Sequence, residues 1–235
     1  MIKPTVEKLI KLKRPDFEFS NCLTNFEILR FSFSLFFMYL RSIICHFLPP
    51  NKLCLIGKGV NIKNRRKLVL GKKVKLDEHV KIDALGKSGV TIGNGVSIGA
   101  YSRIIVSSSY ANIGEGIILG DYVGIGEFSR IGGSGGVEIG KNSIIAQYFS
   151  CHPENHVFSN LDDLIRNQGT IREKIIIGED CWIGAKVTIC AGVNIGASSV
   201  VAAGSVVTKS FPPLSVIAGV PAKIISTRKK AHTSE

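Results

Sequence analysis

An aliphatic residue recurs at every sixth position over the C-terminal part of the chain. The recurrence is strictest from Ile177, with aliphatic side chains at 177, 183, 189, 195, 201 and 207 and glycine following at 178, 184 and 196. A six-residue period fits neither the 3.6-residue turn of an α-helix nor the heptad of a coiled coil. It fits a short strand followed by a tight turn, and a fixed short period of this kind predicts a solenoid.

The same unit occurs earlier in the chain, in several phases. Runs begin at the Ile-Gly pairs 92–93, 113–114 and 139–140, and weaker copies start near residues 56, 70 and 76. The aliphatic residue would point inward, and the glycine or asparagine near the turn accepts unusual backbone dihedrals. Three units would close one triangular coil of roughly 18 residues, with successive coils roughly 4.8 Å apart. We therefore expect a core of stacked aliphatic side chains.

The N-terminal 50 residues lack the repeat and contain the most apolar stretch of the chain. Residues 31–40 read FSFSLFFMYL, a second apolar run covers 42–48, and Arg30 and Arg41 flank the first run. A membrane span needs about 20 apolar residues, and Arg41 interrupts this one. Three interpretations stay open: a helix packed on the main body, a helix in a membrane interface, which the basic flanks and phenylalanines favour, or a poor span. The opening residues are too polar for a secretory signal.

Composition narrows the class of protein further. Hydrophobic residues make up 45% of the 235 residues, which excludes a disordered chain. Lysine and arginine number 30 against 18 acidic residues, a net charge of +12 that indicates an anionic partner: a phosphate-bearing cofactor, a membrane face or nucleic acid. The six cysteines form no CxxC pair, so they indicate neither a zinc site nor a disulfide framework, and we expect a reducing, cytoplasmic location.

Residues 54–225 resemble the hexapeptide-repeat acyltransferases, most closely over 175–225, IIIGEDCWIGAKVTICAGVNIGASSVVAAGSVVTKSFPPLSVIAGVPAKII. The resemblance implies an all-β fold, a left-handed parallel β-helix, although ordinary crossover rules would give a right-handed connection. It is strongest to the maltose, galactoside and colanic-acid type of O-acetyltransferases. We expect a short helical segment at 1–50, a β-helix domain at 51–225 with an inserted catalytic loop at 147–174, and a basic tail at 226–235.

The period lapses between Ile145 and Ile177, and the intervening segment contains His152 and His156. Insertions into a solenoid emerge as loops on one face, where function tends to lie. Histidine is the natural base for acyl transfer at neutral pH. The resemblance places His156, preceded by Asn155, at the family's catalytic position. His152 is the second candidate, and Asn155 is expected to contact the substrate.

Other chemistries at this break are weaker hypotheses. A Cys151 nucleophile would need a base close in space, and adjacent residues rarely orient correctly for that. A zinc site of the γ-carbonic anhydrase kind would need a third histidine, and His79 in a distant coil does not match the spacing, so no metal is expected. Glu127, near a substrate-binding position of the relatives, is a weak candidate to contact the substrate or orient the base.

The resemblance also implies a groove for acetyl-CoA along the coils. Small residues are expected to line it through their backbones, a Thr-Lys pair to lie near the nucleotide phosphates, and a further basic residue to lie near the adenosine. A further arginine of the family is replaced by Ser226, for which Arg228 is a possible substitute. The donor-binding candidates are Trp182, Ala185, Ala203, Thr208, Lys209 and Lys223.

The leading functional hypothesis is an acetyl-CoA-dependent O-acetyltransferase that modifies a sugar hydroxyl in surface-polysaccharide (O-antigen or capsule) biosynthesis. The alternatives are N-acetylation of a free or nucleotide-linked amino sugar and, more remotely, a carbonic-anhydrase-like metalloprotein. The resemblance implies a homotrimer, and the N-terminal segment indicates peripheral contact with the inner face of a membrane. Nucleic acid is not expected, because no stacking-aromatic motif accompanies the basic clusters.

Overall fold

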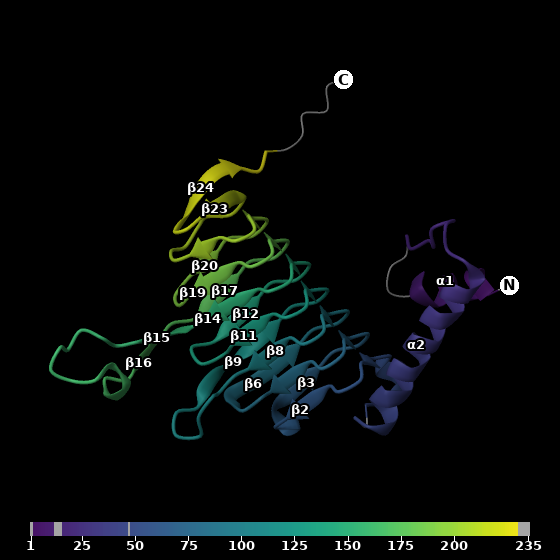
Figure 1. Ribbon diagram of the computed structural model, residues 1–235, viewed down its shortest axis with the longest axis horizontal. Helices are drawn as coiled ribbons and strands as arrows, with labels where there is room; N and C mark the ends of the chain where they lie inside the picture. The colour runs from purple at the N-terminus through teal and green to yellow at the C-terminus, as the bar shows by residue number, and fades with distance from the viewer. Residues whose placement is uncertain (1, 12–15, 47, 230–235) are drawn as a thin grey trace.

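The computed structural model describes residues 2–11, 16–46 and 48–229, and most of the chain forms a stack of three-sided coils (Figure 1). Each side of the stack is a parallel sheet whose neighbours come from successive coils. Sheet A comprises, in order, β1 (Leu55–Ile56), β4 (Lys75–Leu76), β7 (Ser97–Ile98), β10 (Gly124–Ile125), β13 (Ile144–Ile145), β18 (Trp182–Ile183), β21 (Val200–Val201), β23 (Ser215–Gly219) and, antiparallel at its end, β24 (Ala222–Thr227).

The other two sides follow the same order along the stack. Sheet B comprises β2 (Asn61–Lys63), β5 (Lys81–Asp83), β8 (Arg103–Ile105), β11 (Arg130–Gly132), β14 (Ser150–His152), β19 (Thr188–Cys190) and β22 (Val206–Val207). Sheet C comprises β3 (Leu68–Leu70), β6 (Gly86–Ile92), β9 (Gly114–Leu119), β12 (Val137–Ile139), β17 (Ile175–Ile177) and β20 (Asn194–Ile195). Short 3₁₀ turns lie at Pro50–Lys52 (η1), Arg65–Lys67 (η2) and Ile165–Asn167 (η3).

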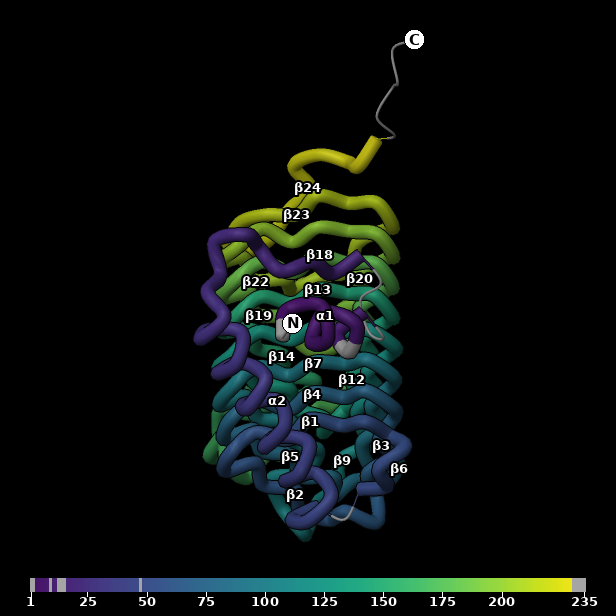
Figure 2. The backbone as a smooth tube through the Cα atoms, turned by 90° about the vertical axis from the view of Figure 1, so that its right-hand side faces the viewer, coloured from purple at the N-terminus to yellow at the C-terminus, as the bar shows by residue number. Residues whose placement is uncertain are grey.

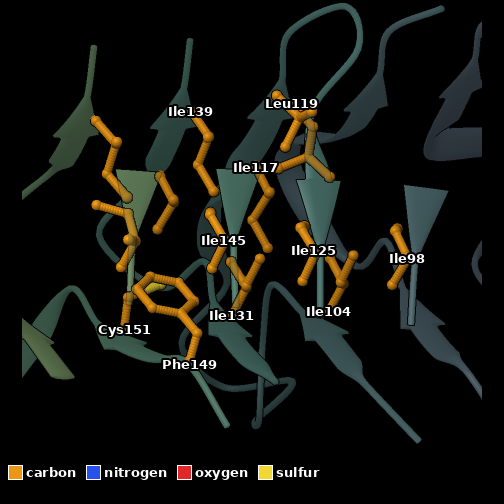
Figure 3. Packing of buried hydrophobic residues seen from close by; sticks show 14 of the residues in the cluster. Ile98, Ile104, Ile117, Leu119, Ile125, Ile131, Ile139, Ile145, Phe149 and Cys151 are labelled. Atoms are coloured by element: carbon orange, nitrogen blue, oxygen red, sulfur yellow. The ribbon is translucent and has the colours of Figure 1, made fainter. Parts of the chain in front are cut away.

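The core is a set of aliphatic columns, as the six-residue period predicts. In-register pairing places Ile98 beside Ile125 and Ile125 beside Ile145, and all three are buried. Figure 3 shows these side chains together with those of the other two sheets, pointing into the space between them. Neighbouring parallel strands are about 4.8 Å apart, so each inward side chain packs directly on its counterpart. The weak repeats near residues 56, 70 and 76 are full strands of this stack.

Backbone crowding between coils explains the glycine that follows many inward residues. A Cβ added at Gly99 would lie 2.4 Å from the backbone nitrogen of Glu127 in the next coil. Real Cβ contacts do not become this short, so a side chain at Gly99 would force the two coils to shift locally.

The regular coil continues further than the sequence pattern indicates. Residues 147–152, expected within the inserted loop, remain in the stack, because Phe149 and Cys151 occupy inward positions and are buried. The segment that leaves the stack, residues 153–173, is called the arm below. It contains the antiparallel pair β15 (Glu154–His156) and β16 (Thr170–Arg172) and projects away from the coils (Figure 1).

Two helices precede the coils. Helix α2 (Asn25–Ile44) begins before the apolar run, at a capping box in which Thr24 and Glu27 bond each other's backbone. It contacts β1, and Arg41 donates a hydrogen bond to the carbonyl of Ile56 at 2.7 Å. Helix α1 (Ile2–Lys11) packs against α2. In Figure 2 both helices lie in front of the coils. Among the described residues, no helix is sufficiently long and apolar to span a membrane.

The stack ends with a reversal of chain direction. Strand β24 runs antiparallel to β23 and extends through Thr227, two residues into the segment expected to be a tail. Arg228 then forms an ion pair with Asp180 at 3.3 Å and donates to the carbonyl of Ser198 at 2.9 Å. The remainder of the expected tail, residues 230–235, lies outside the described residues.

Candidate functional site

The arm presents His156 and Asn155 to solvent. Its two strands pair His156 with Thr170 and Asn155 with Ile171, and both His156 and Asn155 are exposed. Side chains alternate along a strand, so these two side chains lie on opposite faces of the arm. Within the described part of the chain, no hydrogen bond to the His156 ring is present. His156 is therefore available to groups that approach from outside the coil stack.

The arm is anchored at its base by Arg172. The guanidinium lies 2.5 Å from the carboxylate of Glu154 on the opposite strand. It also donates to the carbonyls of Ile113 and Asn112, at 3.0 and 3.2 Å, in the loop that precedes β9. One side chain therefore joins both strands of the arm to a second loop, and it does so two residues away in sequence from His156's partner Thr170.

His152 occupies a different environment at the end of β14. Its Nε2 lies 2.5 Å from the hydroxyl of Ser150, which orients the ring. Burial, and secondarily the positive charge of Arg130, lowers the pKa of His152. A lowered pKa keeps the imidazole neutral at pH 7, the form that accepts a proton. Both histidines are exposed and remain candidates for the base, and His152 in addition has a pKa lowered by desolvation and by Arg130.

The cysteine beside His152 is unsuited to nucleophilic chemistry. Cys151 is fully buried in the core, and burial raises the pKa of its thiol to about 12. The reactive form is the thiolate, which is negligible at neutral pH under these conditions. Across the described residues, no three His, Cys, Asp or Glu side chains are grouped so that they could hold a metal ion.

Three of the predicted site residues share the corner between sheets A and B. The carbonyl of Glu127 accepts from the next coil, and the carbonyl of Ala185 accepts from the backbone nitrogen of Gly204 at 2.8 Å. Ala203 is adjacent to Gly204 and is exposed, and a Cβ added at Gly204 would meet no atom within 4 Å. The corner is therefore narrow and open beside Ala203, as a channel for an extended acyl-carrying arm requires.

The Thr208-Lys209 pair lies across sheet B from this corner. It follows β22 and is exposed, and the Lys209 ammonium lies 5.8 Å from the centroid of the Phe211 ring. Strands β14, β19 and β22 are successive neighbours, so the pair is on the same edge of sheet B as the base of the arm. The outer face of sheet B is thus flanked by Ala185 and Ala203 on one edge and by the arm and Lys209 on the other.

The last two donor candidates lie away from this face. Trp182 is 57% exposed on sheet A, between Ile144 and Val200 in register, and Lys223 is exposed on β24. Arg228, considered as a substitute for the residue that Ser226 replaces, is already paired with Asp180. One subunit therefore places Ala185 and Ala203 on one edge of sheet B and Thr208 and Lys209 on the other, and it leaves Trp182 and Lys223 on other surfaces.

Arg172, Ser150 and Arg130 belong to the site, although they are not among the residues expected there from the sequence. Arg172 contacts a loop about 60 residues earlier in the chain, and no local pattern indicates that contact. Ser150 and Arg130 could have been found, because they are in-register neighbours 20 positions apart, as are Cys151 and Ile131. Aligning successive coils on their inward residues would have placed Arg130 next to Ser150.

Comparisons with known proteins agree with this fold. Residues 174–209 match the family model described as the hexapeptide repeat of succinyl-transferase. The probable acetyltransferase Rv3034c of Mycobacterium tuberculosis (strain ATCC 25618 / H37Rv) is 28% identical over 169 residues, 72% of this chain and 53% of that protein. The putative lipopolysaccharide biosynthesis O-acetyl transferase WbbJ of Escherichia coli (strain K12) is 36% identical over 120 residues, 48% of this chain and 61% of that protein. The chain thus spans little more than half of each relative.

A solved structure gives the same architecture. AntD, an N-acyltransferase from Bacillus cereus crystallised with dTDP and 3-hydroxybutyryl-CoA, superposes with a TM-score of 0.51 at 23% identity, covering 75% of this chain and 80% of that chain. At this identity the likeness shows the fold alone. The predicted fold class, a left-handed parallel β-helix of hexapeptide repeats with a short N-terminal helical segment, is confirmed.

Proposed function

Because the chain carries the repeat and the β-helix fold of the hexapeptide-repeat acyltransferases, we propose that it is an acetyl-CoA-dependent O-acetyltransferase acting on a sugar hydroxyl. The observation that carries the proposal is the arm, which leaves an otherwise regular stack and bears an exposed histidine on the edge of sheet B opposite the open corner. The similarity to WbbJ supports a surface-polysaccharide acceptor, such as a precursor of an O-antigen or capsule.

The reaction needs one general base and no covalent intermediate between enzyme and acetyl group. The neutral His156 imidazole accepts the proton of the sugar hydroxyl as its oxygen attacks the thioester carbonyl carbon of acetyl-CoA. The C–S bond then breaks, and the departing thiolate takes the proton from the imidazolium. Asn155 and Glu127 are proposed to hold the acceptor, and His152 is the alternative base.

The residues around sheet B fit the donor. The open corner at Ala203 and Gly204 accepts a pantetheine chain, which hydrogen-bonds to backbone. Lys209 and Lys223 are exposed, and within the described residues no carboxylate pairs with either of them, so both can neutralise phosphate oxygens. Thr208 can donate a hydrogen bond to the same phosphates, and Ala185 and Trp182 would border the chain.

We further propose a homotrimer with sites between subunits. The arm extends away from its own coils (Figure 1), and Trp182 and Lys223 lie on surfaces that the sheet B face of the same subunit does not reach. A cyclic arrangement would bring the arm of one subunit against a neighbour. An active species whose mass by light scattering is that of one 25.4 kDa chain would contradict this.

Helix α2 supports the proposed contact with the inner face of a membrane. Phe26, Phe33 and Phe37 share one face of the helix and are 74%, 54% and 53% exposed. An apolar helix face on a protein of net charge +12 suits an anionic lipid surface. In vesicle sedimentation, binding to anionic vesicles is expected to fall in a Phe33→Ser, Phe37→Ser variant that keeps its fold.

The decisive experiment measures thiol release from acetyl-CoA over a panel of sugars and nucleotide sugars. His156→Ala should lower turnover by roughly 10²- to 10⁴-fold with native circular dichroism. If His152→Ala abolishes turnover and His156→Ala does not, the base is His152. Turnover only with amino sugars would establish N-acetylation instead, and no thiol release with any acceptor would contradict the proposed function.

A further inference from the structure

Four aromatic rings form a continuous ladder along the corner between sheets A and B. His79, Tyr101, Phe128 and Tyr148 come from four successive coils. Their centroids are 5.0, 5.2 and 5.2 Å apart in order, and the interplanar angles are 16°, 3° and 8°. The last three rings are each about half exposed. The aromatic ladder therefore presents a row of ring edges to solvent, parallel to the axis of the stack.

A row of cations runs beside the aromatic ladder. Lys81, Arg103 and Arg130 each stand two residues after a ring, and in-register pairing places them next to one another on sheet B. All three are exposed, and in the described part of the chain no carboxylate forms an ion pair with any of them. We call these three residues the basic ladder.

The basic ladder is not explained by the needs of folding. The four ring residues adopt φ of 55–60°, the left-handed turn conformation that this corner also takes at Gly59, Lys186 and Gly204. Like charges on directly neighbouring strand positions destabilise a sheet. The rings gain from stacking on one another, whereas the row of like charges costs stability, which indicates selection of that row for an anionic ligand.

Carboxylates nearby do not neutralise the strip formed by the two ladders. Glu78 and Glu127 precede His79 and Phe128, so they lie towards sheet A and not towards the basic ladder. Asp83 accepts hydrogen bonds from Asn64 and from the backbone of Leu85. Among the described residues, the three cations of the basic ladder therefore have no carboxylate as an ion-pair partner.

The chemistry of the strip identifies the class of ligand. Aromatic ring edges carry partial positive charge, so the exposed edges and the basic ladder both attract anions, and the tyrosine hydroxyls can donate hydrogen bonds. The faces of Tyr101 and Phe128 are covered by neighbouring rings. Nucleic-acid bases bind by stacking on open ring faces, and these inner faces are closed. A hydroxyl-rich chain that carries carboxylates fits better.

We propose that the strip binds an extended, carboxylate-bearing polysaccharide and directs it to the histidines. This inference rests on the proposed function and specifies its acceptor. The fourth position of the basic ladder is Ser150, the partner of His152, and the fourth ring is Tyr148 in the same coil. Beyond this coil the corner holds Ala185 and Ala203, the donor side. Acceptor and donor would thus approach the arm from opposite ends of the stack.

The test measures binding of an oligogalacturonate by calorimetry without acetyl-CoA. Lys81→Gln combined with Arg103→Gln should weaken binding at least 10-fold, and Tyr101→Ala combined with Phe128→Ala should weaken it as well. A matched control, Arg66→Gln combined with Lys72→Gln, removes the same charge from exposed positions off the strip and should bind like the wild type. Because Lys81→Gln combined with Arg103→Gln removes repulsion between neighbouring cations, this double variant should unfold at a temperature no lower than that of the wild type.

Several outcomes would overturn the proposal. Equal weakening by the control would mean that only net charge matters. Equally tight binding of the carboxyl-reduced oligosaccharide would exclude a role for the carboxylates, and tighter binding of a thymidine oligonucleotide would make the strip a nucleic-acid site. The calorimetric test contains no acetyl-CoA, so it is independent of turnover. Binding of the oligogalacturonate without thiol release in the activity assay would contradict only the proposed function. Thiol release with neutral acceptors alone would contradict only the proposed role of the strip.

Discussion

Arg172 and Glu154 face each other across the two strands of the arm, with 2.5 Å between the guanidinium Nε and the carboxylate Oε2. The same guanidinium holds the carbonyls of Ile113 and Asn112. The arm is therefore fixed in direction by a group that would not touch the substrates. Arg172 would thus position the proposed base, His156, without taking part in the reaction itself, and this division of roles can be tested.

Arg172→Ala should reduce kcat about 10-fold through misplacement of His156, since small errors in the position of a base are costly. The acetyl-CoA KM should change little, because the donor residues are elsewhere. Hydrogen exchange over residues 154–172 should accelerate, while the midpoint of thermal unfolding should move by only a few degrees. Arg172→Lys, which keeps the charge but not the three-way contact, should resemble alanine; full activity in both variants would show that the arm is positioned by other contacts.

The free energy of unfolding should decrease as the pH falls, because His152 and His46 have lowered pKa values in the folded protein. Burial, then Arg130, lowers the pKa of His152, and burial, then Arg65 and Arg41, lowers the pKa of His46, from an ordinary value of 6.5. Below about pH 6.5 the unfolded chain therefore binds more protons than the folded one, and stability decreases as the pH falls further. Urea unfolding of wild type, His152→Asn and His46→Asn at pH 7.5 and 5.5 should show a smaller loss in each variant. Equal losses in all three would assign the acid sensitivity to other groups.

Gly99→Ala should destabilise the coil stack by about 1–3 kcal/mol, because its Cβ would lie 2.4 Å from the backbone of Glu127. Gly124→Ala is the matched control on the same sheet: its Cβ would meet only the Ser97 hydroxyl at 3.8 Å. The control should change the free energy of unfolding by no more than about 0.5 kcal/mol. Similar losses in the two variants would mean that the close approach to Glu127 does not determine the cost, because the effect of alanine on the unfolded chain alone is stabilising.

Lys209→Ala and Ala203→Leu should weaken donor binding by different mechanisms. The first removes a charge-assisted contact, so the acetyl-CoA KM should rise about 10-fold and the effect should shrink at high salt. The second fills the open corner, so it should abolish binding at any salt concentration. Lys72→Ala serves as the charge control. Normal acetyl-CoA affinity in both test variants by calorimetry would place the donor elsewhere.

The repeat could be predicted because its cause is local. Each inward aliphatic residue packs on another aliphatic residue in the next coil, so the six-residue period survives in the sequence wherever the coils are regular. The period is lost from the sequence where a side chain that is not aliphatic fills the inward position. Cys151, which is buried, stands six residues after Ile145, as the period requires, but a cysteine is not counted as an aliphatic residue. The sequence therefore predicts that the arm starts at residue 147, six residues before its observed start at residue 153.

Contacts between distant segments could not be predicted from the sequence in this way. The candidate histidines stand out because they interrupt a pattern, whereas Arg172 becomes informative only when the loop at 112–113 is seen beside it. The aromatic ladder cannot be predicted from the sequence for a related reason. Tyr101, Phe128 and Tyr148 are separated by 27 and 20 residues, because a loop lengthens one coil, and unequal spacing hides a vertical row.

The reversal at β24 has a consequence for how many copies of the protein can join end to end. A stack of parallel coils offers the next coil an open edge at each end, and two such ends of matching polarity would allow filament growth. Because β24 runs against the direction of every other strand in sheet A, the C-terminal edge no longer matches the first coil of another molecule. The C-terminal end of sheet A therefore cannot be extended by parallel pairing with a second copy, which acts against end-to-end growth of the stack at that side.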